Sequence, residues 1–145
     1  MSIEITAVKS KEDLEGVFKI RETVFVIEQE VSPEEEYDEF EEISTHFLAK
    51  IDGEPAGTAR WRHTADGIKL ERFAVLKPMR GKGVGEALVK AVLEDISAHE
   101  IEKGKILYLH AQLPAVSLYE KFGFLKEGEI FMECGIAHYS MKRTP

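Results

Sequence analysis

Apolar residues recur at two different periods along the chain, and the change from one period to the other predicts a mixture of strands and helices. Residues 3–8 alternate apolar and polar side chains, as a strand does. Ser10 and Asp13 supply an N-cap and an early acid for a helix that runs to about residue 28. After Ser32, a proline and a run of acids interrupt the pattern, which predicts a loop or a short second helix.

The rest of the chain continues this mixture. Residues 45–51 and 55–61 predict two strands of a hairpin, because Asp52-Gly53 between them is a strong turn signal. The later pattern predicts a strand over 70–76, a helix over 84–103 stopped by Gly104, a strand over 106–112, a short helix over 114–122, and strands over 124–127 and 137–142. The chain therefore contains enough alternating elements for one layered core of both strands and helices.

Length and composition predict the number of domains and the location of the protein. With 145 residues, of which 43% are hydrophobic, we expect residues 1–145 to form a single domain. No apolar stretch approaches 18 residues and the amino terminus lacks the order of a signal peptide, so we expect no membrane partner and a cytoplasmic location. The lone cysteine, Cys134, cannot form an internal disulfide, in agreement with a reducing compartment.

Charge excludes one class of partner. The chain has 19 basic and 27 acidic side chains, for a net charge of −8, which repels nucleic-acid phosphates. Much of the excess lies in residues 34–42, where seven of nine residues are acids. This segment is either a solvated loop or a negative rim that attracts a cationic amine.

A glycine-rich junction between a predicted strand and a predicted helix indicates a phosphate ligand. Residues 80–85 read Arg-Gly-Lys-Gly-Val-Gly. Glycines at alternate positions let the backbone turn tightly toward an anion, and the following helix points its positive dipole end at the same place. Arg80 and Lys82 add countercharge. The spacing fits neither a Walker loop nor the dinucleotide fingerprint Gly-x-Gly-x-x-Gly.

The remaining pattern, Arg-x-x-Gly-x-Gly, accompanies Phe73-Ala74-Val75 and the later segment Leu118-Tyr-Glu-Lys-Phe-Gly-Phe124. Together they resemble the GNAT superfamily of N-acetyltransferases, which transfer an acetyl group from acetyl-CoA to an amine, over nearly the whole chain. Residues 21–29 and the Phe-x-Glu-x-Gly-Ile-x-His pattern of residues 131–138 resemble the ElaA/YjcF-like branch of that superfamily.

The resemblance implies an α+β, three-layer GNAT fold with a mixed central sheet of about six to seven strands and helices on both faces. The strands that carry Phe73 and Leu109 would run parallel and splay apart to admit pantetheine, with a β-bulge near residues 72–74. Simple alternation along the first of these strands places Glu71 on the same side as Phe73 and Val75, with Ala74 on the other side.

The resemblance also implies a binding site for acetyl-CoA, and no metal is expected. The implied cofactor-binding residues are Phe73, Ala74, Val75, Arg80, Gly81, Lys82, Gly83, Val84, Gly85, Glu86, Gln112, Ser117 and Tyr119. Gln112 stands where many relatives have asparagine. The phenol of Tyr119 matches the group that protonates the departing thiolate in many relatives; the alternative is a tyrosine that only fills the core.

Two further assignments concern the acceptor. Glu71 is the candidate general base, and the alternative is a surface glutamate paired with Lys69 or Arg72. The residues that the resemblance places around the acceptor, if they do not merely pack, are Phe25, Glu28, Gln29, Arg60, Arg62 and His138. The five histidines show no spacing typical of a metal site.

The expected function is an acetyl-CoA-dependent N-acetyltransferase that acts on a primary amine of a small-molecule or peptidic acceptor, by direct attack in a ternary complex. A covalent route through Cys134 is less favoured, because no paired base adjoins it in the sequence. The alternatives are a non-catalytic CoA-binding sensor or partner module and a transferase for a longer acyl group. Dimers are common in this superfamily, so a homodimer is a further expectation.

Overall fold

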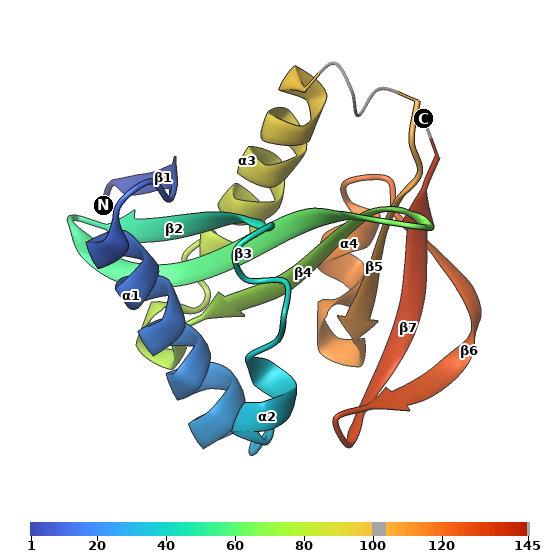
Figure 1. The fold of residues 1–145 in the computed structure, drawn as a ribbon, viewed down its shortest axis with the longest axis horizontal. Coiled ribbons are helices and arrows are strands. Elements are labelled where there is room, and N and C mark those ends of the chain that lie inside the picture. Colours follow the sequence, from blue (N-terminus) through green and yellow to red (C-terminus); the bar gives the residue numbers. More distant parts are fainter. Residues whose placement is uncertain (100–103, 145) are drawn as a thin grey trace.

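A computed structural model describes residues 1–99 and 104–144 of the chain (Figure 1). They form one seven-stranded sheet in the order β1-β2-β3-β4-β5-β7-β6, in which only the β4–β5 pair is parallel. The strands are β1 (Ile3–Ala7), β2 (Thr45–Ile51), β3 (Glu54–Thr64), β4 (Gly67–Val75), β5 (Leu107–Gln112), β6 (Leu125–Glu133) and β7 (Ile136–Arg143). The predicted mixed sheet is therefore confirmed.

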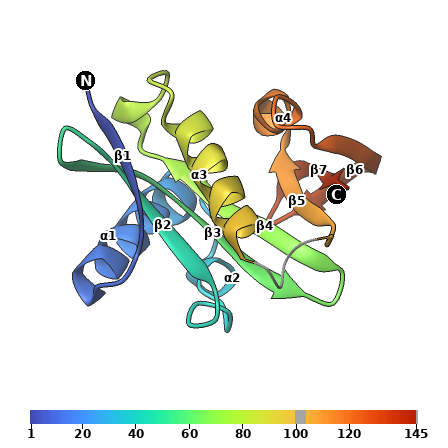
Figure 2. The same ribbon diagram turned by 90° about the horizontal axis from the view of Figure 1, so that it is seen from above.

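Helices cover both faces of this sheet, as Figure 2 shows. One face carries α1 (Lys11–Arg21), its π-helical continuation η1 (Glu22–Glu28), and α2 (Pro33–Glu36). The other face carries α3 (Val84–Ala98) and α4 (Val116–Glu120), with short 3-10 turns before each of them. None of the described helices is long and apolar enough to cross a membrane.

The first helix begins where the sequence predicts. The side chain of Ser10 accepts a hydrogen bond from the Asp13 amide at 3.1 Å, which satisfies one of the donors at the start of the helix. Its buried residues Val17, Ile20 and Val24 pack with residues of β2 and β4. The last turns widen, because the Gln29 amide bonds to the carbonyl five residues earlier, a π-helical change that was not predicted.

The second helix layer is packed closely onto β3. Leu88, Val89 and Val92 of α3 are fully buried. A Cβ atom on Gly57 would lie 2.8 Å from the Ala74 carbonyl oxygen and 3.1 Å from the Leu88 side chain, so β3 needs glycine there. The helix ends at Ala98 and not at residue 103, so Gly104 is not its stop; residues 100–103 of the prediction lie outside the described residues.

The parallel pair splays, as expected. In this pair Ile68 lies opposite Leu107 and Lys69 lies opposite Tyr108. Beyond these residues β4 and β5 are not paired with each other in the described chain. From Leu70 onward, the edge of β4 that faces β5 is therefore free of ladder partners, which is the opening that a strand-like ligand requires.

A β-bulge in β4 overturns the predicted side-chain alternation. Ala74 pairs with Thr58 and Glu71 pairs with Arg60, so two residues of β4 are opposite one residue of β3. Arg72, one of these two, has a φ of +57°. Directly opposite residues share a face, so Glu71 lies on the same face as Ala74 and not with Phe73, contrary to the prediction. Strict alternation fails here because the bulge inserts an extra residue.

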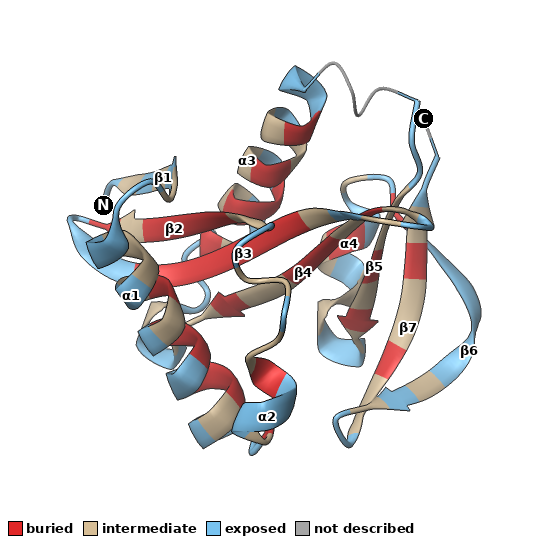
Figure 3. Cartoon of the chain, viewed as in Figure 1, coloured by how far each residue is buried: buried red, intermediate tan, exposed pale blue. Residues whose placement is uncertain are grey.

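The carboxyl-terminal strands form the exposed edge of the sheet. Both predicted strands are present and longer than expected, and β6 is largely exposed along its length (Figure 3). Its inner neighbour β7 pairs with β5, which brings the last hairpin beside the opening between β4 and β5.

Candidate active site

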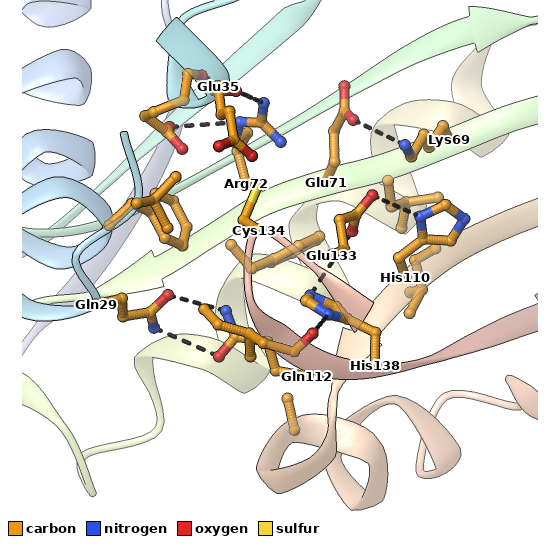
Figure 4. A pocket seen from close by; sticks show the side chains of 18 of the residues that line it. Gln29, Glu35, Lys69, Glu71, Arg72, His110, Gln112, Glu133, Cys134 and His138 are labelled. Carbon is orange, nitrogen blue, oxygen red and sulfur yellow. Dashed lines mark hydrogen bonds and ion pairs between the residues drawn. The ribbon is translucent and has the colours of Figure 1, made fainter. Parts of the chain in front are cut away.

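Two cavities, each of about 490 Å³, meet at the splay between β4 and β5. The glycine-loop cavity is bounded by Arg80, Gly81, Gly83 and the start of α3. The distal cavity, seen in Figure 4, lies on the other side, with Glu71, Glu133 and His138 among its walls. The residues that line both cavities are Gln29, Phe73, Gln112, Ala115 and Tyr119. The cavities therefore share one boundary.

The glycine loop has the backbone that an anion site needs. Gly81 and Gly83 have φ values of +77° and +87°, and a Cβ atom on either would meet nothing within 4 Å. Glycine is therefore needed there for its backbone conformation and not for space. Gly83 is the N-cap of α3 and offers no side-chain cap, so the first amides of this 15-residue helix remain available to an anion.

Most of the predicted cofactor-binding residues lie together. The glycine-loop cavity is lined by Phe73, Ala74, Val75, Arg80, Gly81, Gly83, Val84, Gly85, Gln112 and Tyr119. The other three, Lys82, Glu86 and Ser117, are exposed and are not among its described lining residues. Glu86 is paired with Lys121 at 2.8 Å.

Arg80 is held by a carboxylate from the opposite helix layer. Its Nη1 and Nη2 donate to the two carboxylate oxygens of Glu28 at 2.7 and 2.8 Å, and its Nε donates to the Val75 carbonyl at 2.9 Å. The hydrogen bonds from Arg80 hold the pKa of Glu28 below its usual value. Glu28, expected near the acceptor, thus lies beside the glycine loop and is not among the described residues that line the distal cavity.

The shared boundary contains an amide pair and a buried phenol. Gln112 Nε2 donates to Gln29 Oε1 at 3.0 Å, and Gln29 Nε2 donates back at 3.4 Å, so the two side chains connect η1 to β5 across the opening. Tyr119 is only 6% exposed, and its ring meets the edge of Phe73 at a centroid distance of 5.6 Å. Burial raises the pKa of Tyr119, which therefore keeps its proton at neutral pH.

Glu71 is buried among cations. Its Oε2 accepts from Arg60 Nε at 2.8 Å and from Arg62 Nε at 2.7 Å, and its Oε1 lies 3.4 Å from Lys69 Nζ. Burial would raise the pKa of Glu71, but these three cations lower it overall. Of the two partners expected for a surface glutamate, Lys69 is present in this group.

The acidic segment is anchored to the protein by buried arginines, so it is not simply a solvated loop. Arg21 and Arg60 are both fully buried. Arg21 donates to Glu36 at 2.6 Å and to Glu41 at 2.8 Å. Arg60 donates to Glu41 at 2.6 Å and to Asp38 at 3.0 Å. Arg60 is consequently part of this charge cluster and is not among the described residues that line the distal cavity.

The distal cavity combines expected and unexpected residues. Phe25, Gln29, Arg62 and His138 line it, as the sequence suggests. Its walls also contain charged or titratable residues that were not individually assigned to the acceptor from the sequence, namely Glu35, Glu36 and Asp38 of the acidic segment, Lys69, Arg72, His110 and Glu133. Among the described residues, no group of three or more histidine, cysteine, aspartate or glutamate side chains is placed to hold a metal ion.

The mixed sheet opened between two parallel strands, together with the glycine loop at a helix start, defines an acyl-CoA N-acyltransferase fold. The chain belongs to the GNAT acetyltransferase family, whose domain model matches residues 7–145. The protein is thus an acyltransferase of the N-acetyltransferase type.

Individual relatives agree with this assignment. The uncharacterized N-acetyltransferase YjcF of Bacillus subtilis is 43% identical over 137 residues, which cover 93% of this chain and 95% of YjcF. The crystal structure of Escherichia coli ElaA has a TM-score of 0.85 at 28% identity and covers 98% of this chain and 99% of its own. A Bacillus subtilis acetyltransferase solved in complex with CoA covers 99% of both chains with a TM-score of 0.69, and its 17% identity shows the fold alone.

Proposed function

We propose that the protein transfers an acetyl group from acetyl-CoA to a primary amine of a small-molecule or peptidic acceptor, by direct attack in a ternary complex. The observation that carries this proposal is the meeting of two cavities at Tyr119. A donor in the glycine-loop cavity and an acceptor in the distal cavity would approach each other there, as a reaction without an acyl-enzyme requires.

The glycine loop and the splayed strand fit the donor. In this proposal the amides at Gly81, Gly83 and the start of α3 hold the diphosphate. The free edge of β4 at Phe73 and Val75 pairs with the pantetheine amides as a strand would. A structure of the same fold was solved in complex with CoA, which supports CoA as the group that carries the acyl donor.

Tyr119 is the proposed general acid. Its raised pKa keeps the phenol protonated, so it can donate a proton to the departing CoA thiolate at the boundary of the two cavities. Cys134 is a poor covalent carrier, since burial and a hydrogen bond to Glu35 raise the pKa of its thiol to about 11.

An amine acceptor also needs a proton acceptor. An alkyl amine with a pKa near 10 must give up a proton before it attacks, at a cost of about 4 kcal/mol at neutral pH. The role of Glu71 as this base stays a prediction. Its three cationic partners weaken its affinity for a proton, so its ionised form is better suited to fix Arg62 and Lys69 in the cavity wall.

A single assay tests the function. The purified protein would be incubated with acetyl-CoA and, in turn, spermidine, glucosamine, kanamycin and a peptide with a free amino terminus, and release of the CoA thiol would be followed. We expect release with at least one of these amines, strongly reduced by Tyr119→Phe. Binding of acetyl-CoA by calorimetry without any thiol release would instead favour the non-catalytic binding module. Butyryl-CoA in place of acetyl-CoA tests the choice of acyl group.

A further inference from the structure

A carboxylate lies between two imidazoles in the wall of the distal cavity that β5, β6 and β7 form (Figure 4). Glu133 Oε1 lies 3.3 Å from His110 Nδ1, and Glu133 Oε2 lies 3.7 Å from His138 Nε2. His138 is 6% exposed and lies directly opposite Gln112, which borders both cavities. The group therefore adjoins the passage through which donor and acceptor would meet.

Hydrogen bonding fixes which nitrogen of His138 carries the proton. His138 Nδ1 lies 2.7 Å from the Ile136 carbonyl oxygen, which can only accept, so Nδ1 is the donor. In the neutral ring, Nε2 then has a lone pair, and it faces a carboxylate oxygen that also has no proton. Two acceptors face each other at 3.7 Å, a distance too long for a direct hydrogen bond.

The 3.7 Å separation of Glu133 Oε2 and His138 Nε2 suits a hydrogen-bond donor that carries more than one proton. An ammonium group can donate to Glu133 Oε2 and to His138 Nε2 at the same time, which satisfies both acceptors. Phe131 stacks on the His138 ring at a centroid distance of 5.8 Å and an interplanar angle of 25°, which restrains the ring. The pair is thus held in place before any acceptor enters.

We propose that Glu133 and His138 bind the ammonium form of the acceptor and that His138 Nε2 removes the proton that activates it. This inference rests on the proposed N-acetyltransferase function and adds the residue that receives the proton. His138 is the catalytic residue, because it touches the reacting nitrogen. His110 is a positioning residue, because it acts through Glu133.

Proton transfer precedes acetyl transfer in this proposal. One proton passes from the ammonium nitrogen to His138 Nε2, and the free amine then attacks the thioester carbonyl carbon to form the new C–N bond. When the C–S bond breaks, Tyr119 gives its proton to the sulfur and regains one from the former amine nitrogen. His138 returns its proton to water, so the net products are the amide, CoA thiol and one proton.

Neighbouring charges favour this pair over Glu71 as the proton acceptor. Both oxygens of Glu71 face cations, whereas His138 Nε2 has only Glu133 as a charged partner among the recorded ion pairs of the described residues. Lys69, on β4, is the cation that faces Glu133 from across the cavity, and His110 faces it from β5. An anion, and not a cation, therefore lies beside the nitrogen that would receive the proton.

The pH dependence of kcat/KM for whichever amine is acetylated tests the pair. We expect His138→Gln to lower kcat/KM about 100-fold near pH 7, with a gap that narrows toward pH 9.5 as the free amine becomes abundant. Glu133→Gln should raise KM for the amine with a smaller effect on kcat, since the ammonium group loses one of its two acceptors. His99→Gln is the matched control, because His99 is an exposed histidine that follows α3, and it should leave the profile unchanged.

A loss in His138→Gln that is equal at every pH, or a profile that matches the wild type, would overturn the proposal while leaving acetyl transfer itself intact. If no amine is acetylated, the proposed function fails, and ¹⁵N NMR of the histidine rings still decides the geometry. At pH 8 we expect His138 as the Nδ1–H tautomer with an unprotonated Nε2. An Nε2–H tautomer would contradict the inferred lone pair and, with it, the proposal.

Discussion

Replacement of Arg60 by methionine should destabilise the protein more than the loss of any ion pair on its surface. The Arg60 guanidinium is fully buried and donates to Asp38, Glu41 and Glu71. Methionine fills much of the same volume but removes one of the two arginines that bond directly to the nearly buried Glu71. Removal of one partner from a buried ion pair costs about 3–5 kcal/mol, because the remaining charge stays desolvated.

This loss is large compared with a total stability of about 5–15 kcal/mol. With a urea dependence of about 2 kcal/mol per molar, the unfolding midpoint should fall by roughly 1.5–2.5 M. Fluorescence of the single tryptophan, Trp61, which is 4% exposed, and circular dichroism would follow unfolding. Lys90→Met is the control, since Lys90 and Glu94 are 72% and 69% exposed at 4.0 Å and should contribute less than about 0.5 kcal/mol.

The sign of the pH dependence separates electrostatics from packing. The pKa values of Asp38, Glu41 and Glu71 are lowered in the folded protein: burial opposes the shift, and Arg60 and the other cations outweigh it. These groups therefore stabilise the fold above their unfolded pKa of about 4, and this stabilisation is lost as pH falls through their folded values. The deficit of Arg60→Met should shrink on going from pH 7 to pH 4. A deficit below about 1 kcal/mol at pH 7, or one of equal size at both pH values, would refute the reasoning.

Three other substitutions, with Gly104→Ala as a control, probe the donor site. Tyr119→Phe should lower turnover by about 10²–10⁴-fold with little change in calorimetric affinity for acetyl-CoA; unchanged turnover would remove its acid role. Gly83→Ala, at a φ of +87°, should strain the loop by about 1 kcal/mol and weaken CoA binding several-fold. Gly104→Ala, at +82° but outside the loop, should cost stability without changing CoA affinity. Glu28→Gln releases Arg80 from an exposed ion pair and should tighten CoA binding by up to about fivefold; weaker binding would exclude competition between Glu28 and phosphate.

Local chain geometry explains why most of the cofactor residues that the resemblance implies lie together in one cavity. Gly81 and Gly83 need only a turn and a helix start, and both are encoded within a few residues. The strand and helix pattern around them is also local, so ten of the thirteen proposed cofactor residues line one cavity. Lys82, Glu86 and Ser117 are exposed instead, and the spacing of residues along the chain does not encode the direction of an exposed side chain.

The positions of the residues around the distal cavity depend on features of the fold that a local sequence pattern does not encode. The inserted residue at Arg72 turns Glu71 to the face opposite Phe73, and no alternation rule locates such a bulge to the residue. One signal was available: Cys134-Gly135 is a tight hairpin turn with both φ values positive. Recognising this turn would have placed Glu133 beside the strand that carries His138, within the segment already noted for its resemblance to relatives.

The wall of the distal cavity opposite this hairpin contains Glu36, Asp38 and Arg72, and it is backed by ion pairs in place of apolar packing. Arginines on three different elements, Arg21 on α1, Arg60 on β3 and Arg72 on β4, all reach carboxylates of α2 and the segment after it. Such a wall costs desolvation energy that an apolar one would not. Glu36, Asp38 and Arg72 keep this side of the cavity polar, however, and in the proposed function an acceptor that arrives as a cation would keep favourable partners as it leaves water. In the proposed function the acidic segment would act through the groups that it orders at the cavity, and its exposed carboxylates would add long-range attraction for a cation.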